Sequence, residues 1–247
     1  MSGRVATRWG RVIDYGLTRA VDVDVRHSGE HYGSDHALVL FRVHHKGKEL
    51  RLGLWNAERD RDVAAVVRLV DQLLDAYQLD ALALTEASDY VAELRRLSAT
   101  RPWQLLAGLA SKPGQREVAW LVRDSVPVER FSSPLVAAHG WTTTRGGHTP
   151  PKYLASVRLD GWLWAGVGHR APSVRWRRLL PVGPVRRVAS TIAHARGELR
   201  WARRHPGPLV LLGDWNATPA TRGRWSPHWV ARKARLTVHA PRQGTHR

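Results

Sequence analysis

The sequence of 247 residues contains no cysteine. This absence excludes disulfide bonds and thiolate metal sites, so any bound metal must be held by oxygen and imidazole ligands. No run of about 18 apolar residues occurs, and the first eight residues lack the apolar core of a signal peptide. We therefore expect a soluble, cytoplasmic protein with no membrane partner.

Acidic residues are scarce relative to basic ones: 21 Asp and Glu face 39 Lys and Arg, a formal net charge of +18 at pH 7. This excess is more than solubility requires, and it predicts a polyanionic partner. Most of the basic residues are arginine, and 12 tryptophans accompany them. Arginine forks bind phosphate, and tryptophan rings stack on bases. A GC-rich coding bias is the alternative explanation, so charge alone does not establish nucleic-acid binding.

Internal repeats, low-complexity tracts and a clear linker are also missing from the sequence. With 43% hydrophobic residues, the chain is long enough to bury a large core. We therefore predict one domain that spans residues 1–247.

The spacing of apolar residues predicts a β-rich start, then alternating strands and helices, and then mostly strands. Residues 44–48 have turn composition between two predicted strands, which indicates a β-hairpin. Residues 138–152, rich in Gly, Thr and Pro, are predicted to be irregular. The predicted strands span 11–17, 37–43, 49–55, 79–85, 104–107, 117–122, 126–131, 154–159, 163–167, 209–212 and 236–239, and the predicted helices span 60–77, 89–98 and 188–202.

The most informative stretch runs from Leu209 to Pro219. Its four consecutive aliphatic residues, bounded by a proline and a glycine, are typical of a strand buried on both faces. Asp214 and Asn216 come directly after that strand, so a carboxylate and an amide are placed at its end. An Asx turn is the purely local alternative.

Polar residues also lie at or beside the ends of several other predicted strands. Taken singly, each has a structural explanation: Asn56 could cap the helix that follows, and a lone histidine is usually structural. Their joint appearance beside successive strands favours a shared site. These residues are Asp14, Asp35, His36, Asn56, Glu86 and His169.

Two of these stretches are specific, namely Gly-Asp-Trp-Asn at 213–216 and Gly-Ser-Asp-His at 33–36. With Ile-Asp-Tyr at 13–15 and the single Asn, Glu and His residues, they make the chain resemble the endonuclease/exonuclease/phosphatase superfamily, which has the DNase I-like fold. The resemblance covers nearly all of the chain. It implies an α+β fold, a four-layer αββα sandwich of two mostly antiparallel sheets flanked by helices.

The motifs occur in an unusual order. The family normally begins with the Asn motif and finishes with Asp-Tyr and then Ser-Asp-His, whereas here the two finishing motifs come first, within residues 13–36. Each motif occurs once, which argues against a tandem copy. We therefore expect a circularly permuted domain, in which residues 1–45 correspond to the family's C-terminal part and residues 49–247 to its N-terminal and central part. The hypothesis requires residues 1–45 to lie against Asp214.

Phosphodiester hydrolysis needs a positioned water, a base for it, and positive charge on the phosphoryl oxygens. Carboxylate and amide oxygens hold Mg²⁺ or Mn²⁺, which supply that charge. The resemblance implies that Glu86 and Asn56 are the principal metal ligands and that Asp35 contributes directly or through water.

The resemblance also implies roles for the remaining motif residues. His36, oriented by Asp14, would be the general base or the positively charged partner of the phosphate. Asp214 would orient or activate the nucleophilic water. Asn216 would hold the scissile phosphate, and His169 would be a phosphate ligand or the general acid.

Arginine dominates the region before the strand at Leu209, where residues 170–205 hold ten Arg and one Glu. A solvated helix face is the ordinary explanation for a charge run, but such faces normally mix signs, so a one-signed run favours a phosphate-facing surface. The candidate nucleic-acid contacts are Arg145, Arg170, Arg175, Arg196, Arg200, Arg203 and Arg204.

These features together predict a metal-dependent nuclease, an endonuclease acting on DNA rather than RNA, and a monomer. Two alternatives stay open. One is a phosphatase or phosphodiesterase on a small or lipid phosphate, and the other is a non-catalytic nucleic-acid-binding protein on the same fold.

Overall fold

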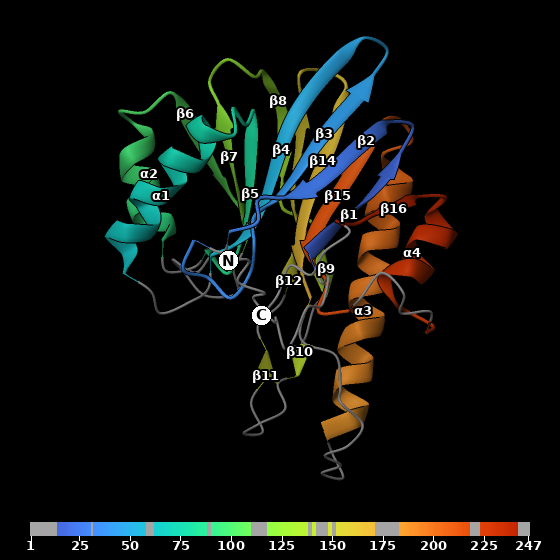
Figure 1. Cartoon of the computed structure of the whole chain (residues 1–247). Coiled ribbons are helices and arrows are strands. Elements are labelled where there is room, and N and C mark those ends of the chain that lie inside the picture. The colour runs from blue at the N-terminus through green and yellow to red at the C-terminus, as the bar shows by residue number, and fades with distance from the viewer. Residues whose placement is uncertain are drawn as a thin grey trace, which may run out of the picture.

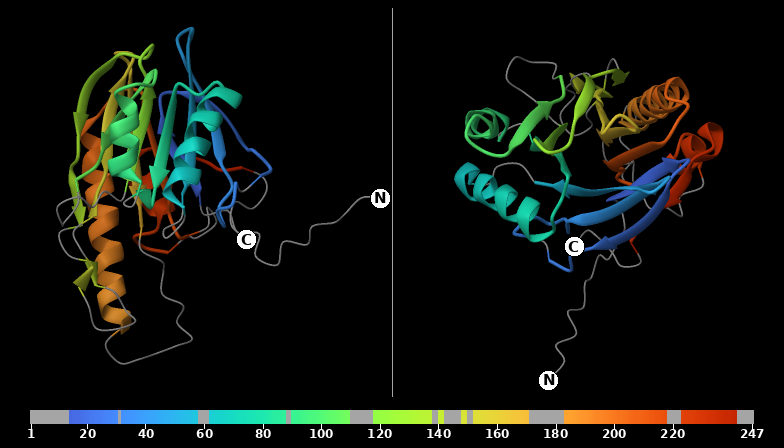
Figure 2. Two further views of the ribbon diagram at one scale, coloured as in Figure 1. Left: turned by 90° about the vertical axis from the view of Figure 1, so that its left-hand side faces the viewer. Right: turned by 90° about the horizontal axis from the view of Figure 1, so that it is seen from above.

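The computed structural model describes residues 14–30, 32–57, 62–87, 90–109, 118–137, 140–141, 148–149, 152–170, 183–217 and 223–241. Two six-stranded sheets form the centre of the molecule, and helices cover both of their outer faces (Figures 1 and 2). This arrangement confirms the predicted four-layer α+β sandwich.

The first sheet has the strand order β16-β1-β15-β14-β13-β8. Only β14 and β15 run parallel within it, and the other neighbours are antiparallel. Its strands are β1 (Asp14–Arg19), β8 (Val128–Ser132), β13 (Ala155–Leu159), β14 (Leu163–His169), β15 (Leu209–Asp214) and β16 (Thr237–His239).

The second sheet has the order β2-β3-β4-β5-β7-β6, again with one parallel pair, β4 with β5. Its strands are β2 (Asp22–His27), β3 (Val39–His45), β4 (Lys48–Asn56), β5 (Ala81–Thr85), β6 (Trp103–Ala107) and β7 (Val118–Arg123). Four short strands form two small separate pairs: β9 (Leu135–Ala137) with β12 (Lys152–Tyr153), and β10 (Gly140–Trp141) with β11 (His148–Thr149).

Three apolar clusters hold the four layers together. The first fills the space between the sheets, where Phe41 and Trp120 of one sheet face residues such as Val157 and Leu212 of the other. The second joins the second sheet to α1 (Val63–Ala76) and α2 (Val91–Ser98), and the third joins the first sheet to α3 (Gly183–Arg204) and α4 (Pro227–Ala234). Among the described residues, no helix has the length and apolar content needed to cross a bilayer.

Local chemistry explains several element boundaries. The side chain of Asp62 accepts a hydrogen bond from the Ala64 amide and caps α1, and Ser226 caps α4 in the same way through Trp229. Lys46 and Gly47 both have positive φ angles, 48° and 80°, as a two-residue hairpin turn requires. The predicted β3–β4 hairpin is therefore confirmed.

Six elements were not predicted from the sequence: the short strands β9, β10, β11 and β12, and two longer elements. The edge strand β2 pairs with β3, and the helix α4 covers part of the first sheet. In addition, residues 138–152, predicted to be irregular, contain the short β10 and β11 strands.

The first described segment is divided between the two sheets. β1 lies between β15 and β16 in the first sheet, whereas β2 and β3 belong to the second sheet. The β1–β15 register places Asp14 directly opposite Asp214. Residues 14–45 are therefore an integral part of the sandwich, and their loops reach the end of the strand on which Asp214 lies.

Candidate active site

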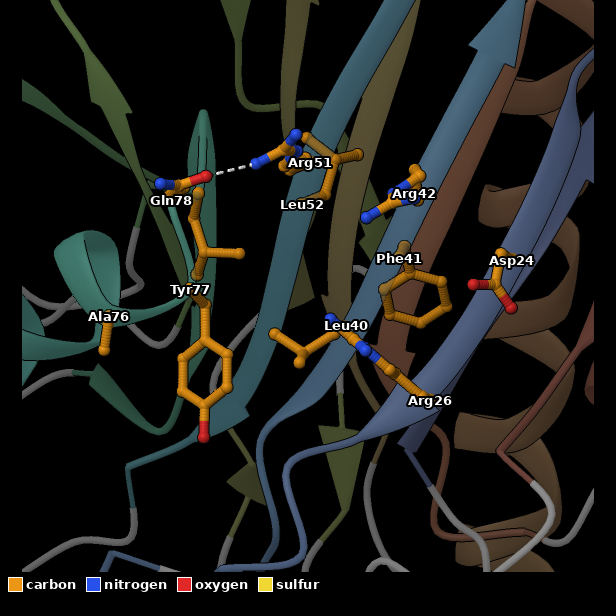
Figure 3. A pocket seen from close by; sticks show the side chains of 11 residues that line it. Asp24, Arg26, Leu40, Phe41, Arg42, Arg51, Leu52, Ala76, Tyr77 and Gln78 are labelled. Carbon is orange, nitrogen blue, oxygen red and sulfur yellow. Dashed lines mark hydrogen bonds between the residues drawn. The ribbon is translucent and has the colours of Figure 1, made fainter.

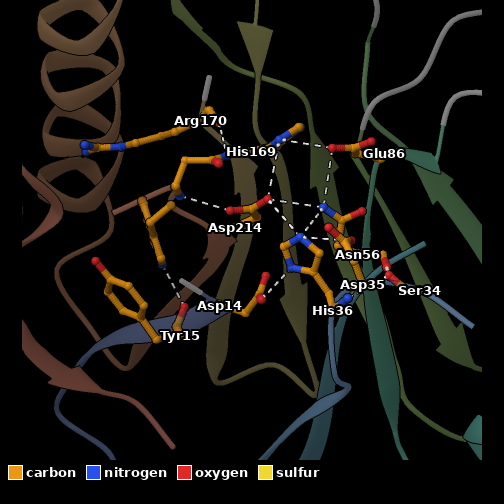
Figure 4. A network of polar contacts seen from close by, with 12 residues as sticks. Asp14, Tyr15, Ser34, Asp35, His36, Asn56, Glu86, His169, Arg170 and Asp214 are labelled. Carbon is orange, nitrogen blue, oxygen red and sulfur yellow. Dashed lines mark hydrogen bonds and ion pairs between the residues drawn. The ribbon is translucent and has the colours of Figure 1, made fainter. Parts of the chain in front are cut away.

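The polar residues that follow the central strands meet at one end of the sandwich (Figure 4). The parallel pairing of β4 with β5 brings Asn56 beside Thr85, the residue before Glu86. In the other sheet, the parallel pairing of β14 with β15 brings His169 beside Asp214. Because the carboxyl ends of parallel strands share an edge of the sheet, both sheets present these side chains to the same space.

Asp214 is the centre of the cluster, and only 2% of its surface is exposed. Its Oδ2 atom accepts a hydrogen bond from Asn56 Nδ2 at 3.1 Å and lies 3.6 Å from His169 Nε2 and 4.0 Å from His36 Nε2. Asn56 Nδ2 also lies 3.4 Å from Glu86 Oε1. One carboxylate oxygen thus connects residues from both sheets.

His36 is held by a buried carboxylate. Its Nδ1 atom lies 2.7 Å from Asp14 Oδ2, and both side chains are almost fully buried. The Ser34 hydroxyl accepts a hydrogen bond from the His36 amide and donates one to the carbonyl oxygen of Asn56. These contacts fix the loop, and they leave Nε2 of His36 facing the space around Asp214.

The surroundings of His36 favour its charged form. Burial by itself lowers the pKa of His36, but the charge and hydrogen bond of Asp14, together with two further carboxylates, outweigh burial and raise the pKa to about 10. The imidazole is therefore a cation at neutral pH in the metal-free site, and Nδ1–H donates to Asp14.

Asp214 is shifted for a different reason. Burial raises its pKa, and the negative charge of Asp14 raises it further, while the two histidines lower it, so that the pKa comes to about 6. A carboxylate with this pKa is ionised at neutral pH and is more basic than an ordinary aspartate. The site therefore separates a cation, His36, from a comparatively basic carboxylate, Asp214.

Two backbone conformations at the site are unusual for residues with side chains. Glu86 and Asn216 have positive φ angles of 54° and 49°. Asparagine adopts this conformation readily, whereas for glutamate it is uncommon and is typical of functional sites. The amide of Asn216 donates to Asp214 Oδ1 at 2.9 Å, and its Nδ2 donates to the carbonyl oxygen of Arg170 at 2.7 Å. Asn216 therefore shapes the loop around Asp214, and its Nδ2 is already bound to the backbone.

The donor atoms present fit a divalent cation. Glu86, His169 and Asp214 bring three ligand atoms within 4.8 Å of one another. Asp14, His36 and Asp214 form a second such group, but in its charged form the His36 ring has no lone pair to offer a metal. Carboxylate oxygens are the ligands that Mg²⁺ and Mn²⁺ prefer. Of the predicted ligands, Glu86 and Asn56 lie together here. Asp35 belongs to neither group, and its half-exposed side chain lies 3.4 Å from His36 Nε2.

The placement of Arg170 does not fit its predicted contact with a nucleic acid. Its side chain is buried, and its guanidinium forms a bidentate ion pair with the buried carboxylate of Glu198, in which Nε lies 2.9 Å from Oε1. Its amide donates to the carbonyl oxygen of Asp214 at 3.0 Å. Arg170 thus joins α3 to the end of β15. Removing either Arg170 or Glu198 would leave the charge of the other buried and uncompensated.

The other predicted basic contacts fall into three groups. Arg196 and Arg200 are exposed on α3, and Arg196 belongs to the same turn as Glu198. Arg203 and Arg204 are exposed at the far end of α3, next to Ala202, whose carbonyl oxygen accepts from Arg19. Arg19 is five residues along β1 from Asp14, which corresponds to about 17 Å at the usual strand rise. Arg203 and Arg204 therefore lie near the end of β1 that is far from Asp14. Arg145 and Arg175 lie outside the described residues.

Three residues that contribute to the site were not predicted from the sequence. Ser34 and Glu198 make the contacts given above, and the carbonyl oxygen of Trp225 accepts from Arg170 Nη1 at 3.1 Å. Glu198 could have been found, because it is the single acidic residue among ten arginines. A lone carboxylate in such a run is the expected partner of a buried arginine.

The sequence profile of the Endonuclease/Exonuclease/phosphatase family matches residues 53–238, most of the chain. The chain belongs to this family. Its members are hydrolases that act on phosphodiester bonds, and they generally use divalent metals. No curated protein sequence matches the chain significantly.

Solved structures share the fold at low sequence identity. A protein of unknown function from Enterococcus faecalis V583 is 14% identical with a TM-score of 0.50, over 69% of this chain and 68% of that one. D. rerio TDP2 in complex with a single-stranded DNA product is 16% identical with a TM-score of 0.47, over 68% of this chain and 61% of that one. The catalytic domain of human nocturnin is 16% identical with a TM-score of 0.46, over 66% of this chain and 59% of that one. The chain thus spans less than two thirds of the TDP2 and nocturnin chains.

Asp14→Asn is expected to lower the pKa of His36 in the metal-free protein from about 10 toward its ordinary value, because the charge that stabilises the imidazolium is removed. Since folding raises this pKa, the associated stabilisation is complete below about pH 6.5 and is lost as the pH rises toward 10. NMR titration of the His36 ring measures the shift directly. Asp22→Asn, on the exposed strand β2, is the control. A His36 pKa that stays near 10 in Asp14→Asn would contradict the assignment.

Proposed function

We propose that the protein is a metal-dependent nuclease that hydrolyses phosphodiester bonds of nucleic acid, and that it is an endonuclease acting on DNA. The observation that carries the proposal is the contact of Asp214 Oδ2 with Asn56, His169 and His36 at the common end of the two sheets. The formal charge of +18 supports a polyanionic substrate over a small phosphate ester.

Asp214 is the residue best placed to activate water. It is ionised at neutral pH, and its raised pKa makes it a better proton acceptor than an ordinary aspartate. The Asn216 amide holds its Oδ1 atom, so that Oδ2 is the atom that faces the reacting space. A water bound there would lose one proton to Oδ2 as its oxygen bonds to phosphorus, and the bond between phosphorus and the leaving oxygen would break.

His36 supplies positive charge rather than a base. An imidazolium cannot accept a proton, and the Nε2–H of His36 points at the same space as Asp214 Oδ2. It would donate a hydrogen bond to a phosphoryl oxygen as negative charge develops there. Asp14 keeps the ring oriented and charged. Of the two roles predicted for His36, we therefore favour the positively charged partner of the phosphate.

Glu86 and His169 lie on the side of Asp214 away from His36, and His169 Nε2 is 3.6 Å from Glu86 Oε1 (Figure 4). A bound Mg²⁺ or Mn²⁺ would neutralise charge on the phosphate and its leaving oxygen. We propose that Glu86 and Asn56 hold this cation, with Asp35 contributing through water. His169 is placed to contact the phosphate or to protonate the leaving oxygen.

We further propose that the domain is circularly permuted, with residues 1–45 corresponding to the family's C-terminal part. The antiparallel pairing of β16 with β1 matches His239 with Gly16, and continuing this register brings Pro241 level with Asp14. A short loop between these two residues would therefore make β16 and β1 a hairpin. The family profile begins at residue 53, after β1, β2 and β3, which supports the same order.

Cleavage of supercoiled plasmid tests the proposed activity. We expect cleavage that EDTA abolishes and added Mg²⁺ or Mn²⁺ restores. His36→Ala and Asp214→Asn should each reduce the rate by about 100-fold or more, because each removes a group that acts on the reacting phosphate. His44→Ala, near the opposite end of β3, should leave the rate unchanged.

The substrate panel should include single-stranded DNA, RNA and a small phosphodiester. Failure to cut any nucleic acid with either metal would overturn the nuclease assignment. Hydrolysis of the small ester alone would favour a phosphatase, and binding of nucleic acid without turnover would favour a non-catalytic protein.

A rearranged chain tests the permutation. It would start at Gly47, run to Pro241, continue through a short Gly-Ser linker into Asp14 and end at Lys46. We expect cooperative unfolding and a cleavage rate comparable to that of the natural order, because the new join only closes the β16–β1 hairpin. The same join with new ends between Leu52 and Gly53 would interrupt a central strand and serves as the negative control. A rearranged chain that does not fold would contradict the proposal.

A further inference from the structure

The surface of α4 and the turn before it carries charge of one sign. Residues 223–241 contain no Asp or Glu, and their basic residues are all exposed. The helix dipole accounts for the cations at the C-terminal end of α4, but not for Arg224, which precedes the helix. These basic residues are Arg224, Arg232, Lys233 and Arg235.

Two tryptophans lie among these cations. The ring centroids of Trp225 and Trp229 are 4.5 Å apart. The guanidinium groups of Arg196 and Arg224 lie 5.2 Å and 5.1 Å from the centroid of Trp225. Trp225 thus contacts arginines from α3 and from the turn, and Trp229 lies on α4 itself, as do Arg232 and Lys233.

A hollow of about 460 Å³ opens on this surface. It is lined by Arg224, Trp229, Arg232 and Lys233, three cations and one aromatic ring. Such a combination suits a phosphate together with a planar, apolar group. We call these four residues the α4 hollow.

Another hollow, of about 250 Å³, lies on the outer face of the second sheet and serves as a contrast (Figure 3). It has arginines too, but Asp24 also lines it, and Arg51 is bound to Gln78 at 2.6 Å and to Glu49 at 2.9 Å. Its mixed signs give a polyanion little advantage. The α4 hollow differs because none of the described residues that line it is acidic.

Hydrogen bonds of Arg170 connect the turn before α4 to the active site. Ser226 caps α4, and Val230, Ala231 and Ala234 bury its inner face. The turn before it is fixed by the hydrogen bond from Arg170 Nη1 to the Trp225 carbonyl oxygen. Because Arg170 also bonds to Asp214 through its amide, the hollow and the catalytic strand share one support.

We propose that the α4 hollow binds an unpaired nucleotide of the substrate, with its base stacked on Trp229 and its phosphates on Arg224, Arg232 and Lys233. The face of a base is free for such stacking only where the strand is unpaired, so the hollow selects single-stranded segments of the substrate. This inference rests on the proposed nuclease function and specifies its substrate.

An anionic membrane would also attract this surface, but apart from the half-buried Trp225 and Trp229 its described residues present no large apolar side chain for insertion. Among the described residues, the exposed large hydrophobic side chains are Leu109 and Leu135, and neither belongs to α4. Interfacial helices need an exposed apolar face. Binding to lipid vesicles is therefore an outcome that the test must exclude.

Fluorescence anisotropy with the full chain in EDTA separates binding from cleavage. We expect Trp229→Ala to weaken binding of a labelled single-stranded oligonucleotide by about 10-fold and to leave binding of the matching duplex nearly unchanged. Trp229→Leu keeps apolar bulk without a stacking face and should behave like Trp229→Ala, whereas Trp229→Phe should restore binding. Trp162→Ala, in the β13–β14 turn, is the control.

The cations are tested by salt dependence. Arg232→Gln combined with Lys233→Gln should reduce the slope of log affinity against log salt by about 1.4 for a single strand, since each phosphate contact contributes about 0.7. Arg68→Gln combined with Arg95→Gln removes the same charge from α1 and α2 and should change the slope little.

Equal losses on single strand and duplex in the tryptophan variants would overturn the inference. So would loss of binding to phosphatidylserine vesicles with no change in oligonucleotide binding. The two proposals fail separately. If the wild type cleaves nucleic acid but the variants bind normally, the proposed nucleotide binding in the α4 hollow is wrong. If the variants lose single-strand binding but the wild type cleaves nothing, the proposed nuclease function is wrong.

Discussion

Two carboxylates, Asp14 and Asp214, face each other on adjacent antiparallel strands and are almost completely buried. Buried like charges at this spacing are costly unless positive charge compensates them. His36 supplies that charge through its bond to Asp14, and His169 contributes from the neighbouring strand. The raised pKa of His36 and the raised pKa of Asp214 both follow from this constraint. One arrangement of strands therefore yields both a cation and a basic carboxylate at the same end of the sandwich.

The constraint also explains why distant parts of the chain must fold together. β1 and the loop before β3 bring Asp14 and His36, while β15 brings Asp214 from about 200 residues away. Around that centre, the buried Arg170–Glu198 pair connects the strand end to α3, and Trp225 connects it to α4. The two helices of this outer layer carry exposed arginines, among them Arg196, Arg200 and Arg232.

Most of the sandwich and the site could be predicted from the sequence, because its signals are local. The aliphatic run before Asp214, the Lys46–Gly47 turn and the polar residues beside the strands are all readable in order along the chain. β2 was missed because its alternation of Asp and Val is short and lies at a sheet edge, where burial is weak. Arg170 was predicted to face the nucleic acid because composition does not show which of the ten arginines is buried. The single Glu198 indicates a buried pair, but only the fold shows that Arg170 is its partner.

The central claim is that His36 and Asp214, from opposite parts of the chain, act as one catalytic unit. The most direct measurement is a double-mutant cycle on kcat/KM for DNA cleavage with His36→Ala, Asp214→Asn and the double variant. Residues that act as a unit give strongly non-additive losses. We expect the double variant to be little worse than the more damaged single variant. Losses that multiply would show that the two residues act independently, and would contradict the proposal that they form one unit.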